Sequence, residues 1–223
     1  MPGKDYFVGA DPERLPRETL EQLRTYGACV VSDALRGFNA MDGRIRAVSP
    51  GTCVCGCAVT VRLRPGDNLM LHRAIEAARP GDILVLDTCG SYRHAVIGGM
   101  MSSAAFGKGI GGMVIDGAVR DVEELRSNGY AVFAAAVVPN TGESEGPGQL
   151  NHPVSCGGVP VLPGDVVVAD DNGVAVVPRG AVDWVLEACA QKCRAEQQRR
   201  SEIQSGQLTA AAITEKLRRL GYD

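Results

Sequence analysis

The stretch IDGAVRD, residues 115–121, ends an apolar run with two adjacent and opposite charges. Arg120 can form a two-pronged hydrogen bond with a substrate carboxylate, and Asp121 can bind a hard divalent cation. Both follow a predicted buried strand, and ligands of α/β sheets bind where such strands end. The alternative is a helix cap, because Asp121 with Glu124 three residues later matches an N-cap and its reciprocating acid. Taken alone, this short stretch favours the cap and leaves the site open.

A second candidate is the Gly98-Gly99 pair, which precedes the predicted helix MMSSAAFGKG. Glycines let a ligand approach the backbone, and the free N–H groups at the start of a helix favour an anion. The alternative is a tight loop packed against a neighbouring strand. The dinucleotide fingerprint Gly-x-Gly-x-x-Gly does not follow a strand, so the pattern does not indicate a nucleotide site.

Other residue types with catalytic potential lack the necessary spacing. The histidines are too far apart in the sequence to indicate a zinc triad. The Gly-x-Ser-x-Gly stretch at 142–146 lies in a long predicted loop and not at a turn from a strand into a helix, so it does not indicate a nucleophile elbow. Neither of the two lysines that a Schiff-base mechanism could use follows a strand in an apolar setting. These residues are His72, His94 and His152, and Lys108 and Lys192.

Three of the eight cysteines form the row CVCGC at Cys53, Cys55 and Cys57. Alternate residues of a strand point to one face, which suits a row of small buried groups. Zinc knuckles space their thiolates differently, around a turn and with a second pair elsewhere. The N-terminus carries no secretory signal, so we expect reduced thiols rather than disulfides.

The elements that must position these candidates alternate between strands and helices. Strands are predicted at 53–63, 83–87, 112–116 and 131–139, with a hairpin turn at 171–173; helices are predicted at 16–27, from Ser32, at 69–79, 100–109 and 121–129, and after about 179. This order predicts an α/β fold with helices packed on a mixed sheet or barrel-like core. No linker or repeat divides the chain, so we expect one domain over residues 1–223, with a helical C-terminal extension from about 179.

Composition excludes several classes of function. The net charge is −3 and the basic residues are scattered, so no basic face for nucleic acid is indicated. The apolar runs are too short to cross a bilayer. We therefore expect a cytoplasmic protein with neither a nucleic acid nor a membrane as partner.

Several motifs together resemble those of RraA-like proteins. The segments are VSDALRG, GCAVTVRLRPGDNLMLHRAIEAARPGDILVLD, AVIGGMMSSAAFGKGIGGMVIDGAVRD and HPVSCGGVPVLPGDVVVADDNGVAVVP, in this order. The likeness covers roughly residues 28–206, and residues 98–121 are its most specific part. The family includes class II 4-hydroxy-4-methyl-2-oxoglutarate/4-carboxy-4-hydroxy-2-oxoadipate aldolases, which also decarboxylate oxaloacetate.

The resemblance implies a swivelling β/β/α-type domain that assembles as a homotrimer or homohexamer with sites between subunits. It implies Mg²⁺ or Mn²⁺ at Asp121 and a small 2-oxo acid substrate contacted by Arg120. Gly98 and Gly99 would begin the substrate-binding helix, and the backbone N–H groups of the next two residues, Met100 and Met101, would hold the substrate carboxylate. A catalytic acid from a neighbouring subunit's C-terminal helix would complete the pocket, and Glu196 is the candidate.

One position departs from the family pattern. Aldolases of this family commonly carry an acid where this chain has Gly99, so one acid of the metal site would be missing. Decarboxylation needs no base for a hydroxyl proton and is the less demanding reaction. The resemblance thus implies a metal-dependent lyase that forms pyruvate from 2-oxo diacids by aldol cleavage, decarboxylation or both. The alternative is a non-catalytic RraA-type regulator that binds an RNA-degradation enzyme; such regulators lack the acid that Asp121 provides.

Overall fold

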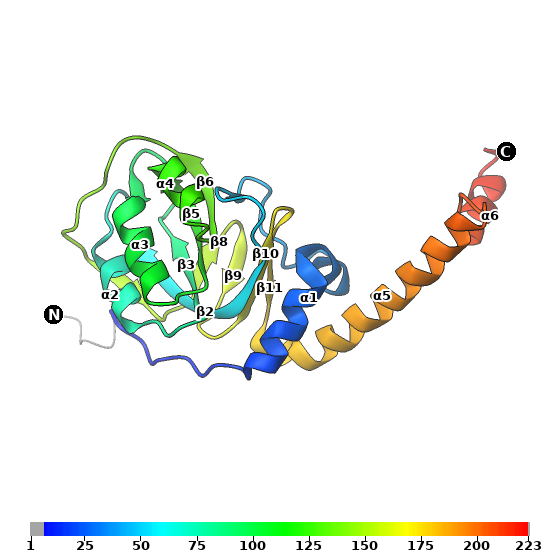
Figure 1. Ribbon diagram of the computed structural model, residues 1–223, viewed down its shortest axis with the longest axis horizontal. Helices are drawn as coiled ribbons and strands as arrows, with labels where there is room; N and C mark the ends of the chain where they lie inside the picture. Colours follow the sequence, from blue (N-terminus) through cyan, green and yellow to red (C-terminus); the bar gives the residue numbers. More distant parts are fainter. Residues whose placement is uncertain (1–6, 223) are drawn as a thin grey trace.

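The computed structural model describes residues 7–222, and within them nine strands form one mixed sheet (Figure 1). These strands are β1 (Arg46–Ala47), β2 (Val54–Leu63), β3 (Ile83–Asp87), β4 (Ala95–Ile97), β5 (Gly112–Val119), β6 (Val132–Val137), β7 (Gly148–Leu150), β10 (Val166–Asp170) and β11 (Gly173–Val177). The order is β1-β6-β5-β3-β2-β10-β11, with β4 beside β5 and β7 beside β2. The pairs β2–β3, β3–β5, β4–β5 and β5–β6 are parallel, whereas β10 pairs antiparallel with β2 and β11. The α/β prediction with a mixed sheet is confirmed.

Alternate residues of the strands face different cores, which gives the sheet its barrel-like character. In β10, Val167 and Ala169 face an inner core, whereas Val166 and Val168 face the helices outside. The short strands β8 (Val154–Cys156) and β9 (Val159–Val161) close over this inner core. It consists of Met41, Ile45, Ala58, Ile83, Val85, Val114, Ala131, Phe133, Val154, Cys156, Val159, Val161, Val167, Ala169, Val174 and Val176. Period-two burial on both faces explains the Val-rich runs in the sequence.

Helices cover the outside of the sheet in two separate groups (Figure 1). The first group is α2 (Leu69–Ala77), α3 (Gly99–Gly107) and α4 (Val122–Ser127), which pack over β3 and β5. The second is α1 (Arg17–Ala34) and α5 (Val182–Gln204), which pack on β10 and β11. Each group buries its own apolar cluster, so the sheet lies between two helical layers.

Helix α1 is interrupted at Gly27, the position where the sequence predicts one helix to end and a second to follow. The structure has one helical span from Arg17 to Ala34 in which Gly27 alone is non-helical, at φ 73° and ψ 171°. The freed N–H of Ala28 donates to Asp170 Oδ2 at 2.9 Å, at the β10–β11 turn. The expected N-cap, Ser32, lies inside the helix, because the interruption is a single-residue kink.

The C-terminal segment begins with a 3-10 turn at Arg179–Ala181 and continues as α5 and α6 (Ala211–Arg219). Only the first part of α5 is buried, through Val182, Val185 and Cys189. The rest projects from the body as an arm that ends in α6 (Figure 1). Along residues 7–222 no helix combines the length and apolar character that a membrane crossing requires.

The buried carboxylate of Asp67 joins α2 to the loop that follows β6. It accepts backbone hydrogen bonds from Leu69 at 2.9 Å and from Glu145 and Gly146 at 2.7 Å each. Burial alone would raise the pKa of Asp67, but the N–H groups of Leu69, Gly146 and Glu145 and the charge of Arg64 lower it below its usual value. The loop that reaches the site described below is thus held by one ionised side chain.

We expect Asp67→Asn to lower the free energy of unfolding by about 1–3 kcal/mol at pH 7, because an amide has only one acceptor oxygen for three donors. Since the folded-state pKa is lowered, the carboxylate's contribution is present above the unfolded value of about 3.9 and is lost as pH falls through the folded value. Urea unfolding at pH 7 and pH 3 should therefore show a difference between variant and wild type that narrows in acid. A matched control is Asp33→Asn, an exposed acid paired with Lys192. If the two substitutions lowered the free energy of unfolding equally, the stabilising role of the Asp67 carboxylate would be contradicted.

Candidate functional site

The candidate site lies where three parallel strands end side by side. Arg120 directly follows β5, and its N–H donates to the carbonyl of Ile97, the last residue of β4, at 3.0 Å. On the other side the N–H of Val138, just after β6, donates to the carbonyl of Val119 at 3.0 Å. The three chain exits are therefore held at one edge, which is where α/β sheets bind ligands.

Asp121 has an unusual backbone and does not cap α4 with its side chain. It adopts the left-handed conformation, φ 57° and ψ 43°, and makes no side-chain cap hydrogen bond. Its Oδ2 instead accepts the N–H of Gly99 at 3.0 Å and lies 3.5 Å from Arg120 Nε. The cap interpretation of the carboxylate is therefore wrong, although the Asp121 carbonyl still accepts the first N–H groups of the helix, those of Glu124 and Leu125. A non-glycine residue held left-handed is a feature that clusters at functional sites.

Two carboxylates of the same chain lie where side chains at positions 98 and 99 would be. A Cβ atom on Gly98 would overlap Asp121 Oδ2 and lie 3.0 Å from Arg120 Nε. A Cβ atom on Gly99 would lie 2.6 Å from Glu124 Oε1 and closer still to Oε2. In the sequence, the two glycines are interpreted as room for a ligand to approach the backbone. In this structure the Asp121 and Glu124 carboxylates occupy that room.

The start of α3 offers backbone donors beside these carboxylates. The first N–H groups of a helix have no intrahelical acceptor. The N–H of Gly99 donates to the Asp121 carboxylate, and the N–H of Ser102 donates to the Gly98 carbonyl at 3.1 Å. The N–H groups of Met100 and Met101 lie between these two residues in the first turn of α3, where the helix dipole favours an anion. This arrangement agrees with the substrate-binding role expected for these residues, which stays a prediction.

Two adjoining hollows share Arg120 and Asp121. The larger, about 680 Å³, extends over Glu124 and the β6 exit at 137–139. The smaller, about 70 Å³, extends over the start of α3 to Asn68 and Thr141. Sequence reasoning missed Asn68 and Thr141, which lie far from Arg120 in the sequence and were not singled out as site residues.

Nearby acids inside the sheet are fully engaged and serve the fold. Asp116 of β5 accepts from Tyr92 Oη at 2.8 Å, Arg44 at 3.1 Å and the N–H of Gly157 at 2.8 Å. Burial opposes ionisation, but these three donors lower the pKa of Asp116 below its usual value. Asp116 thus links β5 to the segments at 44 and 157 and leaves the exposed Asp121 carboxylate for a ligand.

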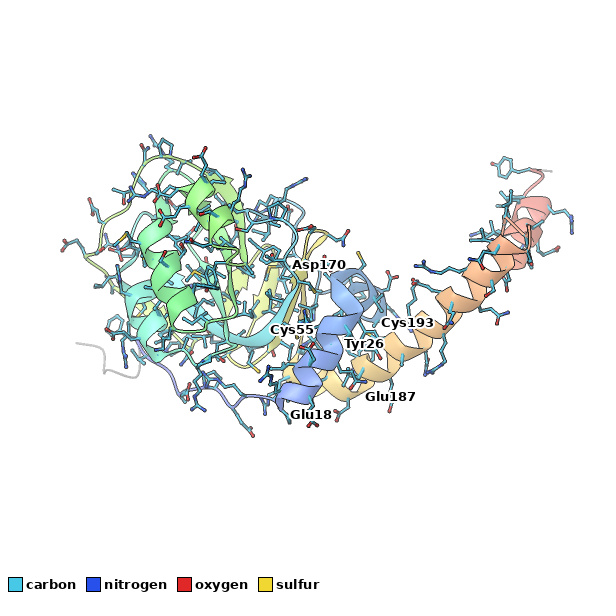
Figure 2. All side chains as sticks on the ribbon, viewed as in Figure 1. Glu18, Tyr26, Cys55, Asp170, Glu187 and Cys193 are labelled. Carbon is cyan, nitrogen blue, oxygen red and sulfur yellow. The ribbon has the colours of Figure 1, made fainter. Side chains whose placement is uncertain are left out.

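Glu196 does not join this site within one chain. It lies on α5, 3.4 Å from Lys192 Nζ, which also pairs with Asp33 of α1 at 2.8 Å. Figure 2 labels Cys193, three residues earlier, on the arm and far from the α3–α4 layer. The expected role of Glu196 depends on a neighbouring subunit and stays a prediction.

The cysteine row faces α1, where Figure 2 labels Cys55 near Tyr26. All eight cysteines are free, and burial raises the thiol pKa of Cys55 and Cys156. Among residues 7–222, no group of three or more His, Cys, Asp or Glu side chains could hold a metal ion. The preference for thiols over a zinc cluster stays a prediction, and Cys29 and Cys89 are exposed rather than buried.

Comparison with known proteins places this geometry in a family. The family described as RraA-like, Aldolase/RraA, matches residues 28–176. The chain belongs to the RraA-like family. A Halalkalibacterium halodurans protein, provisionally named a 4-hydroxy-4-methyl-2-oxoglutarate aldolase, is 34% identical over 89% of this chain and 94% of its own. A Thermus thermophilus protein named 4-hydroxy-4-methyl-2-oxoglutarate aldolase is 38% identical over 50% of this chain and 68% of its own.

The family also contains proteins of another kind. The crystal structure of Streptomyces coelicolor RraAS2, described as an unusual member of the RNase ES inhibitor RraA protein family, superposes with a TM-score of 0.77. It is 28% identical and covers 85% of this chain and 100% of its own. Membership in the RraA-like family therefore leaves two functions to compare.

We expect Gly98→Ala to displace the Asp121 carboxylate, because the added methyl group overlaps Asp121 Oδ2. Loss of the bond to Gly99 should lower the free energy of unfolding by about 1 kcal/mol in a urea titration. The control is Gly107→Ala in the same helix, where an added Cβ meets nothing within 4 Å and stability should be unchanged or slightly higher. If the two alanine variants unfold at the same urea concentration, the close approach at Gly98 does not constrain Asp121.

Proposed function

We propose that this protein is a divalent-metal-dependent lyase that cleaves a carbon–carbon bond in small 2-oxo diacids and releases pyruvate. The reaction is of the 4-hydroxy-4-methyl-2-oxoglutarate aldolase type, the oxaloacetate decarboxylase type, or both. The observation that carries the proposal is the Asp121 carboxylate, which is turned from the α4 cap toward the start of α3, beside Arg120. The aldolase names of relatives support the same class.

The donors present at Asp121 fit a hard divalent ion. Its Oδ2 accepts the N–H of Gly99, whereas no side chain or backbone group in the described part of the chain donates to Oδ1. Mg²⁺ commonly binds through one or two carboxylates together with substrate groups and keeps several waters, and an exposed carboxylate in an open hollow is compatible with this mode of binding. A bound Mg²⁺ or Mn²⁺ would supply Lewis-acid stabilisation of the charge that develops on the substrate's keto oxygen.

Residues of this chain would bind the substrate and stabilise the charge that forms during the reaction. Arg120 would hold a substrate carboxylate or keto oxygen through its planar guanidinium and stabilise the enolate charge. The N–H groups of Met100 and Met101 would bind the carboxylate at the positive end of α3. In decarboxylation the bond between C3 and the C4 carboxylate breaks, CO₂ leaves, and the electron pair forms pyruvate enolate, which takes a proton at C3. Aldol cleavage also needs a base for the C4 hydroxyl proton.

The full pocket would form between subunits of a homotrimer or homohexamer. The observation that supports this is that α5, the helix that contains Glu196, runs away from its own chain's α3–α4 layer (Figure 1). Light scattering after size-exclusion chromatography measures the assembly directly.

The alternative function is a non-catalytic regulator that binds an RNA-degradation enzyme. The structural likeness to RraAS2 favours it. The two functions differ in what they require of Asp121: a lyase needs its carboxylate, whereas a docking surface does not need a metal ligand.

We expect the purified protein with Mg²⁺ or Mn²⁺ to release pyruvate from oxaloacetate faster than the metal alone. Asp121→Ala should abolish that excess, because it removes the carboxylate that would hold the ion. The measurement is a coupled pyruvate assay over a panel of 2-oxo diacids. Wild type and Asp121→Ala giving equal rates on every substrate would rule out the lyase.

We expect Arg120→Lys to raise KM and lower kcat in the same assay. An ammonium group is a point charge and cannot reproduce the two-pronged contact of the guanidinium. The loss should be about tenfold or more in kcat/KM, in line with the loss of a charge-assisted hydrogen bond. Unchanged kinetic constants would exclude Arg120 from substrate binding.

A further inference from the structure

A separate hollow of about 200 Å³ lies where the end of β2 pairs with the start of β7. The chain exit of β3 and the segment at Phe7 complete it, and the Phe7 carbonyl accepts the N–H of Leu150 at 2.8 Å. No residue that lines this hollow also lines the two hollows at Arg120. It is therefore distinct from the candidate site described above.

Apolar residues form most of the walls of this hollow. Phe7, Pro65 and Pro147 line it together with Leu63, which is fully buried. Phe7 is half-buried and the two prolines are exposed, so a ligand in the hollow would remove apolar surface from water. The volume lies below the range of about 300–1,000 Å³ that drug-sized ligands occupy, so the ligand must be small.

Two guanidinium groups also line the hollow. Arg62 and Arg64 are alternate residues at the end of β2, and alternate residues of an extended chain point to one face. Arg62 Nε donates to Asp87 Oδ2 at 3.2 Å, and Arg64 Nη1 donates to the carbonyl of Gly146. Among residues 7–222 no group accepts a hydrogen bond from the terminal nitrogens of Arg62 or from the other nitrogens of Arg64. Both side chains thus keep donors for a ligand.

The acids near these arginines already accept other donors. Asp87 Oδ1 accepts the N–H of Cys89 at 2.8 Å, in addition to the bond from Arg62 to Oδ2. The charge of Arg64 helps to lower the pKa of Asp67, whose carboxylate is buried and accepts three backbone N–H groups. Neither acid occupies the free edges of the guanidinium groups.

Apolar walls beside free guanidinium donors fit a ligand with a short hydrocarbon body and one carboxylate. A guanidinium can donate two parallel hydrogen bonds to a carboxylate, which no uncharged group accepts as strongly. A second carboxylate on the ligand would lie against the apolar walls and lose its hydration without a partner. The hollow therefore favours a monocarboxylate over a dicarboxylate.

We propose that this hollow is a second ligand site that binds a small aliphatic monocarboxylate. The hydrocarbon body would lie against Phe7, Pro65 and Pro147, and the carboxylate would accept hydrogen bonds from Arg62 and Arg64. The proposal does not depend on the lyase function, because none of these residues belongs to the site at Arg120.

The thiol of Cys89 provides a direct measure of occupancy. Cys89 is exposed and lines this hollow, whereas Cys29 is also exposed but lines a different hollow beside α1. Burial and the charge of Asp87 raise the pKa of Cys89 against the opposing charge of Arg62, so alkylation is compared at one fixed alkaline pH. Iodoacetamide labelling of the full chain, followed by peptide mass spectrometry, gives the rate at each cysteine. Hexanoate should slow alkylation of Cys89 saturably at millimolar concentration and leave Cys29 unchanged.

Two further comparisons test the contribution of the guanidinium groups. Hexan-1-ol has the same chain length without the charge and should protect Cys89 about tenfold more weakly than hexanoate. Arg62→Gln and Arg64→Gln should each raise the half-protecting hexanoate concentration about fivefold or more. The matched control is Arg24→Gln on α1, an exposed arginine paired with Glu21 at 2.6 Å, which should leave that concentration unchanged. Thermal unfolding of each variant checks that the fold is kept.

The outcomes decide the proposal without reference to pyruvate formation. If hexanoate does not protect Cys89 in the wild type, or slows alkylation of Cys29 equally, the hollow is not a ligand site. If hexan-1-ol protects Cys89 as well as hexanoate does, the guanidinium groups do not recognise a carboxylate and the proposed ligand class is wrong. Selective protection by hexanoate that either arginine variant weakens would support the site, whatever the result with Asp121→Ala.

Discussion

The hydrogen bond from the Gly99 N–H to Asp121 Oδ2, 3.0 Å long, connects the end of β5 to the start of α3. It forms only because Asp121 adopts a left-handed backbone and because Gly98 has no side chain in the path of the carboxylate. Both conditions depend on the sheet, since hydrogen bonds from Arg120 to β4 and from Val138 to β5 fix where the chain leaves the strand. A single polar contact at the edge of the sheet thus depends on three strands and two helices.

The two helical layers differ in how close they lie to the edge of the sheet that carries the candidate site. Helices α2, α3 and α4 pack over the strands whose ends form the hollows, and Asp67 holds the loop that carries Thr141. Helices α1 and α5 pack over the antiparallel part, away from these hollows. The inner core between the layers is almost entirely aliphatic, so the charged groups that matter for chemistry remain at the rim.

Much of the fold could be predicted from the sequence because periodicity and turn residues are local signals. The central strands, α2, α3, α4 and the 171–173 turn lie where these signals place them. The two helices expected on either side of Gly27 are present, but the second begins directly after the kink and not at Ser32, since Asp170, far away in sequence, accepts the N–H of Ala28 that the kink frees. The candidate site also contains some residues that local sequence signals identify and others that they do not. The Arg120–Asp121 pair and the glycines carry a motif, whereas Glu124 was recognised as an acid but given the wrong partner, because capping and reaching across to α3 have the same sequence pattern.

The two glycines at the start of α3 also constrain how this site can diverge. Position 98 cannot gain a side chain without displacing a carboxylate, whatever the rest of the chain does. Position 99 can gain one only if the Glu124 carboxylate moves aside or residue 124 becomes smaller. Residues 99 and 124 are therefore constrained together, because the Glu124 carboxylate occupies the volume that a side chain at position 99 would fill.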